Sequence, residues 1–210
     1  MGTNKGLKCT IGKVRASYVH VFEPYAFDNK GEKKYSMAVL IPKDDKKSID
    51  TINECVKRAY QYSGVQDKWK GTSPKEFVHP LHDGDAQKSD KPEYADCLYL
   101  NAKNSTKPGL VKKTGTKMVD GVRKNILVPI TDEAEFYSGC WVYVSLGFYA
   151  YKSGLDYGVA CSVDNILKVE DGEPLGGRNS AEYDFGGMDI PDDIDDDPFG
   201  DAPKDDCPFL

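Results

Sequence analysis

The sequence predicts a mainly β protein, an antiparallel barrel of five or six strands with one helix, followed by an acidic tail. Segments rich in β-branched and aromatic residues alternate with period two and are separated by turn residues. Only one stretch repeats apolar residues at helical spacing. Several short strands joined by hairpin turns are typical of a closed or partly open barrel.

The first half of the chain supplies two strands and the helix. Residues 8–22 alternate loosely and predict the first strand, which ends in turn residues around Pro24. Residues 34–41 predict the second strand, which Pro42 ends. Apolar residues at helical spacing predict the helix over residues 48–62.

The second half begins with a change of composition. Residues 61–96 are rich in Gly, Pro, Lys and Asp, with little periodicity, and predict a long irregular insertion. Short strands are expected at residues 97–102 and 158–169. Between them a basic segment leads to Asp120-Gly121, a dipeptide that marks a hairpin turn.

Residues 140–151 form the clearest strand. The even positions are all apolar and are expected to face the core, because side chains alternate across a sheet. The odd positions carry Trp141, Tyr143, Tyr149 and Tyr151 around two small residues, an arrangement that leaves room for a ligand across the strand. The alternative is that the helix or the insertion covers this aromatic face.

The last thirty residues and the rest of the chain have opposite net charge. Residues 181–210 hold eleven carboxylates and one lysine, a net charge of −10, whereas the whole chain carries −6 and residues 1–180 therefore carry +4. We expect a domain over residues 1–175 and a disordered acidic tail over residues 176–210. No apolar run is long enough for a membrane span and no secretory leader is evident, so a cytoplasmic protein is expected.

Aromatic side chains interleaved with cations predict a surface for single-stranded nucleic acid. Cations neutralise phosphates, and flat side chains stack on bases at about 1 to 3 kcal/mol each. The candidate contacts are Arg15, Tyr25, Phe27, Lys34, Lys103, Lys107, Lys112, Lys113, Arg123, Lys124, Tyr143, Tyr149 and Tyr151.

A histidine and aspartate cluster suggests a different class of protein. His79, His82, Asp83 and Asp85 lie within seven residues and could serve a metal-dependent nuclease. Asp83-Gly84 is equally a common turn, and the six scattered cysteines have no metal-ligand spacing. Motifs for nucleophilic catalysis and phosphate loops are absent from the sequence, so we expect no enzyme, no metal and no cofactor.

The tail has an internal pattern. Two acidic clusters each end in a Pro-Phe pair, which a tail that only maintains solubility does not need. Charge attracts a basic partner at long range, and an apolar anchor adds specificity at short range. The candidate partner-binding residues are Asp195, Asp196, Asp197, Phe199, Asp205, Asp206 and Phe209.

These features together resemble a known family. The tail is similar to that of bacterial single-stranded DNA-binding proteins, and the body resembles small single-stranded DNA-binding proteins of tailed bacteriophages. The similarity rests on ordered segments that read YVHVFEPYAF, KKYSMAVLIPKDD, PLHDGD, NAKNSTKPGLV, YSGCWVYVSLGFYAY and GVACSVDNILKVEDGEPLG.

The resemblance implies an OB-fold barrel without enzymatic activity that coats single strands during phage DNA replication, recombination or repair. It also implies that the tail recruits replication proteins. As partners we expect single-stranded DNA, replication or recombination proteins through the tail, and further copies of the chain on DNA. Leu210 follows the last Phe, and the stronger acidic cluster, before Phe199, is internal, which leaves open which module binds. The alternatives are the nuclease and an acidic DNA-mimic protein that binds no DNA itself.

Overall fold

The structure is a computed structural model that describes residues 7–26, 31–61, 77–153 and 156–175. Contacts group the chain into residues 1–177 and 178–210, and every described element belongs to the first group. Phe27 and the tail lie outside the described residues. In the described part, no helix has the length and apolar character needed to cross a membrane.

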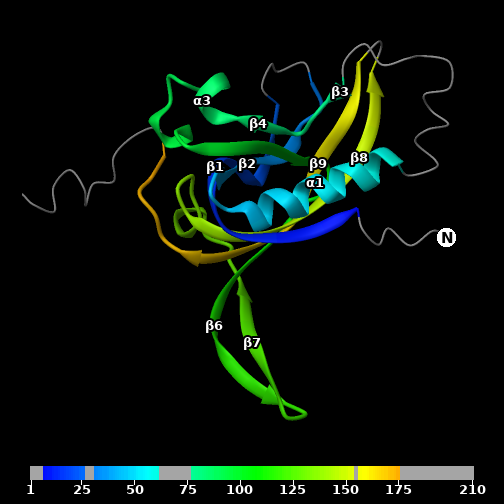
Figure 1. Cartoon of the computed structure of the whole chain (residues 1–210). Coiled ribbons are helices and arrows are strands. Elements are labelled where there is room, and N and C mark those ends of the chain that lie inside the picture. The colour runs from blue at the N-terminus through cyan, green and yellow to red at the C-terminus, as the bar shows by residue number, and fades with distance from the viewer. Residues whose placement is uncertain (1–6, 27–30, 62–76, 154–155, 176–210) are drawn as a thin grey trace, which may run out of the picture. The chain divides into compact units, whose positions relative to one another are not determined.

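The described chain is built mainly of strands (Figure 1). In chain order its elements are β1 (Lys8–Tyr25), β2 (Lys34–Pro42), α1 (Lys46–Gln61), β3 (Phe77–Val78), β4 (Leu81–Asp83), α3 (Gly84–Gln87), η2 (Pro92–Tyr94), β5 (Cys97–Asn104), β6 (Gly109–Val119), β7 (Val122–Pro129), η3 (Glu133–Glu135), β8 (Trp141–Ser153) and β9 (Asp156–Glu170).

Five strands close into a barrel. Antiparallel pairs join β5, β2, β1, β8 and β9 in that order, and a short parallel pairing of β5 with β9 completes the ring. The closing ladder consists of Ala102 opposite Cys161, and the Asn104 side-chain amide adds a 2.9 Å hydrogen bond to the Val163 carbonyl. The expected barrel is confirmed, with β3, β4, β6 and β7 as additional strands outside the ring.

Helix α1 covers one side of the barrel, where it contacts β1, β8 and β9 (Figure 1). Its buried side chains, including Ile52, Val56 and Ala59, recur at helical spacing and face the core. The Asp45 carboxylate accepts a hydrogen bond from the Ser48 backbone N–H at 3.1 Å, which satisfies one of the free donors of the first turn.

The alternation predicted for residues 140–151 is confirmed in β8. The even-numbered side chains from Cys140 to Ala150 are all buried in the core. On the opposite face, Tyr143 and Tyr149 remain 44% and 49% exposed. The aromatic face is therefore not covered by the helix or by the described part of the insertion.

The insertion is more regular than the sequence suggests. Between residues 77 and 94 it forms β3, β4, α3 and η2, and β4 pairs with β5 while β3 pairs with β9. Tyr94 packs edge-on against Tyr99 at 5.1 Å, and together with Leu40 they form a second small core. These elements are two to four residues long and depend on pairing with distant strands, so they leave no periodic signal in the sequence.

Strands β6 and β7 form a ribbon that extends away from the barrel (Figure 1). Only the first residues of β6, Gly109 to Lys112, pair with β9, and β7 pairs with β6 alone. The predicted hairpin turn is present: Asp120 and Gly121 have φ values of 52° and 75°, the left-handed pair that a tight two-residue turn requires. We call residues 109–129 the arm.

Candidate nucleic-acid interface

Two hollows adjoin on the outer face of the barrel. The first has a volume of about 640 Å³ and the second about 320 Å³. Both are lined by Asn101 and Lys103 of β5, so they adjoin at this strand, and we call the two hollows together the groove. The remaining walls come from β1, β2 and the insertion in the first hollow, and from the insertion, β8 and β9 in the second.

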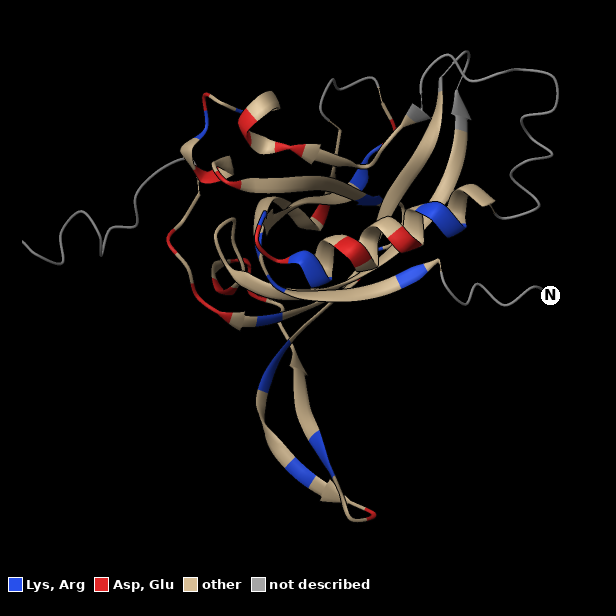
Figure 2. Cartoon of the chain, in the orientation of Figure 1, with Lys and Arg blue, Asp and Glu red and all other residues tan. Residues whose placement is uncertain are grey.

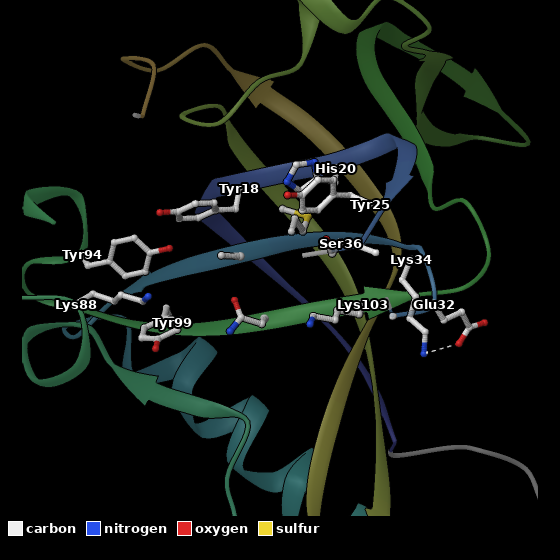
Figure 3. Close-up of a pocket in the computed structure, with 15 residues that line it drawn as sticks. Tyr18, His20, Tyr25, Glu32, Lys34, Ser36, Lys88, Tyr94, Tyr99 and Lys103 are labelled. Atoms are coloured by element: carbon white, nitrogen blue, oxygen red, sulfur yellow. Dashed lines mark ion pairs between the residues drawn. The ribbon is translucent and has the colours of Figure 1, made fainter. Parts of the chain in front are cut away.

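Exposed rings from β1 form one wall of the first hollow (Figure 3). His20 and Tyr25 stack with their ring centroids 4.5 Å apart and an angle of 12° between the planes. Tyr25 is 49% exposed, so this stacked pair presents an aromatic surface to the hollow. Tyr18 is similarly exposed and lies 5.6 Å from the ammonium of Lys91.

The floor of the first hollow is made of buried rings. The Tyr99 hydroxyl donates a 2.9 Å hydrogen bond to Oε1 of Gln87, which fixes the ring in place. Burial raises the pKa of both Tyr94 and Tyr99, so their hydroxyls remain neutral. Because these two rings are almost fully covered, they support the hollow and do not offer stacking faces.

Cations lie along the same hollow (Figure 3). Lys34 is held by Glu32 at 3.2 Å, while Lys103 is exposed and forms no ion pair with any described residue. Lys103 lines both hollows. Its ammonium can therefore attract an anion in either hollow, because opposite charges attract at long range.

The second hollow continues the pattern with Tyr149, Tyr151 and two histidines. Burial lowers the pKa of His79 and of His82, so both rings are neutral near pH 7. The neutral form of His79 is also consistent with its Nδ1 accepting a 3.1 Å hydrogen bond from the Leu81 N–H. This hollow thus offers aromatic surface with little fixed charge apart from Lys103.

The carboxylates next to these histidines have a structural role. Lys43 Nζ lies 2.8 Å from Asp83 and 2.6 Å from Asp85, and its hydrogen bonds, together with its charge, hold the pKa of both carboxyls below their usual range. The Asp83 side chain also accepts from the Asp85 N–H at the start of α3. Among the described residues, no group of three or more His, Cys, Asp or Glu side chains is placed to bind a metal ion.

The groove contains five of the residues that the sequence nominated: Tyr25, Lys34, Lys103, Tyr149 and Tyr151. The other candidates that the structure describes lie outside both hollows. Tyr143 packs directly over the backbone of Gly12, where a Cβ would meet its ring at 2.2 Å. The Arg15 guanidinium donates to the Glu173 carbonyl at 2.7 Å and so fastens the segment that follows β9.

The other cations that the sequence predicted as DNA contacts also lie outside the groove. Lys107 lies over the Phe22 ring at 5.8 Å, and Lys112 pairs with Glu135 at 2.5 Å at the base of the arm. The arm carries the other nominated cations, and none of them lines either hollow. These cations are Lys113, Arg123 and Lys124.

Sequence reasoning missed several residues that line the groove. Tyr99 and Asn101 could have been found from Lys103, since residues two apart on a strand share a face and these three do. Tyr18 and His20 could not, because the pairing of β1 with β2 shifts register on both sides of His20 and breaks the alternation. His79 and His82 were noted only as possible metal ligands, and both line the second hollow.

A five-stranded ring with a long ribbon and a groove on the face that includes β2 and β5 defines an OB-fold-like protein. The chain belongs to the family described as Enterobacter phage Enc34 single-stranded DNA-binding protein, whose model matches residues 7–195. It is therefore a member of a family of phage single-stranded DNA-binding proteins, as the resemblance in the sequence indicated.

Individual relatives agree with this assignment. The single-stranded DNA-binding protein from bacteriophage Enc34, solved in complex with single-stranded DNA, is 25% identical, with a TM-score of 0.64 over 82% of this chain and 91% of that one. The protein described as putative protein p50 of Acyrthosiphon pisum secondary endosymbiont phage 1 is 27% identical over 83% of this chain and 90% of its own length. The single-stranded DNA-binding protein of bacteriophage T7 shares the fold, with 18% identity and a TM-score of 0.53 over 83% of this chain and 96% of that chain.

Proposed function

We propose that the chain binds single-stranded DNA along the groove, largely without regard to base sequence and without chemical change to the DNA. The observation that carries this proposal is the alignment of exposed rings in both hollows, Tyr25 in the first and Tyr149 in the second, on either side of Lys103. Every base has a flat face, so stacking tolerates any sequence, and the ammonium neutralises phosphate. Membership in a phage family supports a role in the DNA replication, recombination or repair of a phage in the host cytoplasm.

We further propose that the acidic tail has two roles. Its net charge of −10 and the +4 of the rest of the chain favour competition with DNA for the groove. Once DNA displaces the tail, the Pro-Phe modules that end in Phe199 and Phe209 become available to replication or recombination proteins. Leu175, the last described residue, lines another hollow together with Tyr18, and Tyr18 also lines the first hollow of the groove. This position supports the proposal, because the tail follows Leu175 in the sequence.

A stacking test separates the groove from the rest of the aromatic face. Tyr149→Ala removes a ring from the second hollow and should weaken binding of oligo-dT by about 1 to 3 kcal/mol, or roughly fivefold to 150-fold. Tyr143→Ala is the matched control, because Tyr143 lies on the same strand at similar exposure but outside both hollows. Titrations followed by intrinsic fluorescence measure both; equal losses in the two variants would contradict the assignment of the groove.

Tail competition is tested by removing residues 181–210. The shortened chain should bind oligo-dT more tightly at low salt, and the difference should disappear as salt rises, because screening weakens the attraction of the tail to the groove. Unchanged or weaker binding at low salt would argue against competition. Incubating the full chain with labelled single strands and Mg²⁺ or Mn²⁺ also distinguishes binding from nuclease activity, since a binder leaves the strand at full length.

A further inference from the structure

The arm exposes aliphatic side chains among its cations. Met118 and Val122 are 65% and 58% exposed near the tip, and Ile126 and Leu127 are 39% and 47% exposed farther back. The same ribbon carries several Lys and Arg residues and a single carboxylate at its turn (Figure 2). Exposed apolar groups that are repeated on a protruding element mark a surface that binds another molecule.

The register of the ribbon places two lysines side by side on one of its faces. Lys117 lies directly opposite Lys124, an arrangement that destabilises a strand pair because the two charges repel. In the part of the chain that is described, neither lysine forms an ion pair. A ligand that brings carboxylates or phosphates to this face would relieve the repulsion.

An apolar shelf lies next to the two lysines on that face. Ile126 is two residues from Lys124 and so points to the same side, and its cross-strand partner is Gly115. Only the tip of Ile126, at 3.7 Å, lies within reach of a Cβ placed on Gly115. The missing side chain leaves space for a flat group against the isoleucine.

Single-stranded DNA is a poor match for this surface. Residues 109–129 contain no aromatic side chain, whereas the groove gathers exposed rings beside Lys103. Stacking on aromatic rings supplies much of the affinity for single strands. Phosphates would neutralise the cations of the arm but leave its aliphatic groups in water.

We propose that this face of the arm docks the acidic C-terminal tail of the protein itself, outside the groove. Each tail module places its last aspartate two or three residues before a phenylalanine, in Asp197-Pro198-Phe199 and in Asp206-Cys207-Pro208-Phe209. An extended chain covers about 3.3 to 3.6 Å per residue, so a bound, extended module would place the residues at 197 and 199 about 7 Å apart. Lys124 and Ile126 have the same two-residue spacing along their strand.

This pairing gives the tail a second binding site. In the proposed complex, carboxylates of the tail pair with Lys117 and Lys124, which lie opposite each other, and a phenylalanine ring of the tail packs on Ile126, whose cross-strand partner is Gly115. The arm therefore holds the tail when DNA occupies the groove, either within one copy or between neighbouring copies. The docking does not depend on how DNA binds, so it is tested separately.

A labelled peptide of residues 191–210 tests the proposal directly with the full-length protein at low salt, with the groove filled by saturating oligo-dT. Lys117→Glu/Lys124→Glu should weaken peptide binding at least tenfold, and Ile126→Ser about threefold. Two controls are matched to these variants. Lys47→Glu/Lys57→Glu makes the same change of charge on the exposed side of α1, and Leu127→Ser removes an equally exposed side chain from the opposite face of the arm; both should change binding less than twofold.

Carbodiimide cross-linking then locates the contact in the unmodified chain. Cross-links should join Lys117 or Lys124 to aspartates between Asp195 and Asp206, at several times the yield seen for Lys47 and Lys57. Mixing ¹⁴N-labelled and ¹⁵N-labelled protein separates contacts within one copy from contacts between copies, and either result supports docking. Equal loss of peptide binding in both charge-reversed variants overturns the proposal, as does an arm variant that loses oligo-dT affinity while still binding the peptide.

Discussion

The groove and the arm both present cations, yet their surroundings differ completely. In the groove, Lys103 stands between exposed rings that belong to β1 and β8. On the arm, Lys117 and Lys124 stand beside aliphatic groups with no ring nearby in the ribbon. Under the two proposals above, cations alone do not identify the DNA-binding surface of this protein; the side chains between them distinguish the proposed surface for bases from the proposed surface for acidic peptide.

The largest expected effect comes from removing one ring from each hollow. If one strand crosses both hollows, Tyr25→Ala/Tyr149→Ala should lose the sum of the two single losses, about 2 to 6 kcal/mol. Met118→Ala/Leu127→Ala on the arm should leave oligo-dT affinity unchanged. Titration with long and short oligo-dT checks both, and a double variant no weaker than the single variants would show that the hollows do not act as one groove.

Salt dependence provides the next contrast. Each phosphate contact to single-stranded DNA contributes about 0.7 to the slope of log affinity against log salt. Lys103→Ala should lower that slope by about 0.7, while Lys113→Ala on the arm should leave it unchanged. The measurement is a series of binding constants over several salt concentrations; a slope that falls equally in both variants would place the arm on the DNA path.

The pH dependence of stability should reflect the second hollow. Burial lowers the pKa of His79 and His82, so above the ordinary value of about 6.5 neither the folded nor the unfolded state holds their protons. Below it the unfolded state takes up protons first, and stability is lost as pH falls. His82→Gln should flatten the decline of the melting temperature between pH 7 and pH 5. The arm contains no histidine, so hydrogen exchange in the ribbon should not share this decline.

The smallest expected effect lies within the arm. Lys117→Glu converts a like-charge pair with Lys124 into an opposite-charge pair, worth about 0.2 to 1 kcal/mol to the ribbon. Backbone amides of β6 and β7 should exchange more slowly in this variant, while the melting temperature of the barrel stays the same. Slower exchange throughout the barrel would show that the arm and the barrel unfold together.

Most of the fold prediction rested on the period-two alternation of apolar and polar residues along the strands. The strand of residues 140–151 and the hairpin turn at Asp120-Gly121 were predicted correctly, because a buried face and a left-handed turn both leave local marks in the sequence. The small elements of residues 77–94 were not predicted. They exist because Tyr94 packs on Tyr99 and β4 pairs with β5, which are contacts between distant parts of the chain.

The candidate site was predicted less completely for a similar reason. The alternation of odd and even positions separated the exposed face of β8 from the core. It could not show that Tyr149 faces a hollow while Tyr143 covers Gly12. That difference depends on the neighbouring strand: β1 lies against Tyr143, and the histidines of the insertion lie near Tyr149. Positive charge in the sequence did not distinguish groove residues from arm residues either. Lys103 and Lys113 both lie in basic segments, but only Lys103 lines the groove, and Lys113 lies on the arm that extends from the barrel (Figure 1).

The closure of the barrel has a mechanical consequence. Between β5 and β9 the seam consists of one ladder pair, Ala102 with Cys161, and the single bond from Asn104, whereas the other joins of the ring have long ladders. The second hollow straddles this seam, with Asn101 on one side and Ala160 on the other. A polymer bound there would act as an external brace across the shortest join, so the free energy needed to open the barrel should rise with the logarithm of ligand concentration.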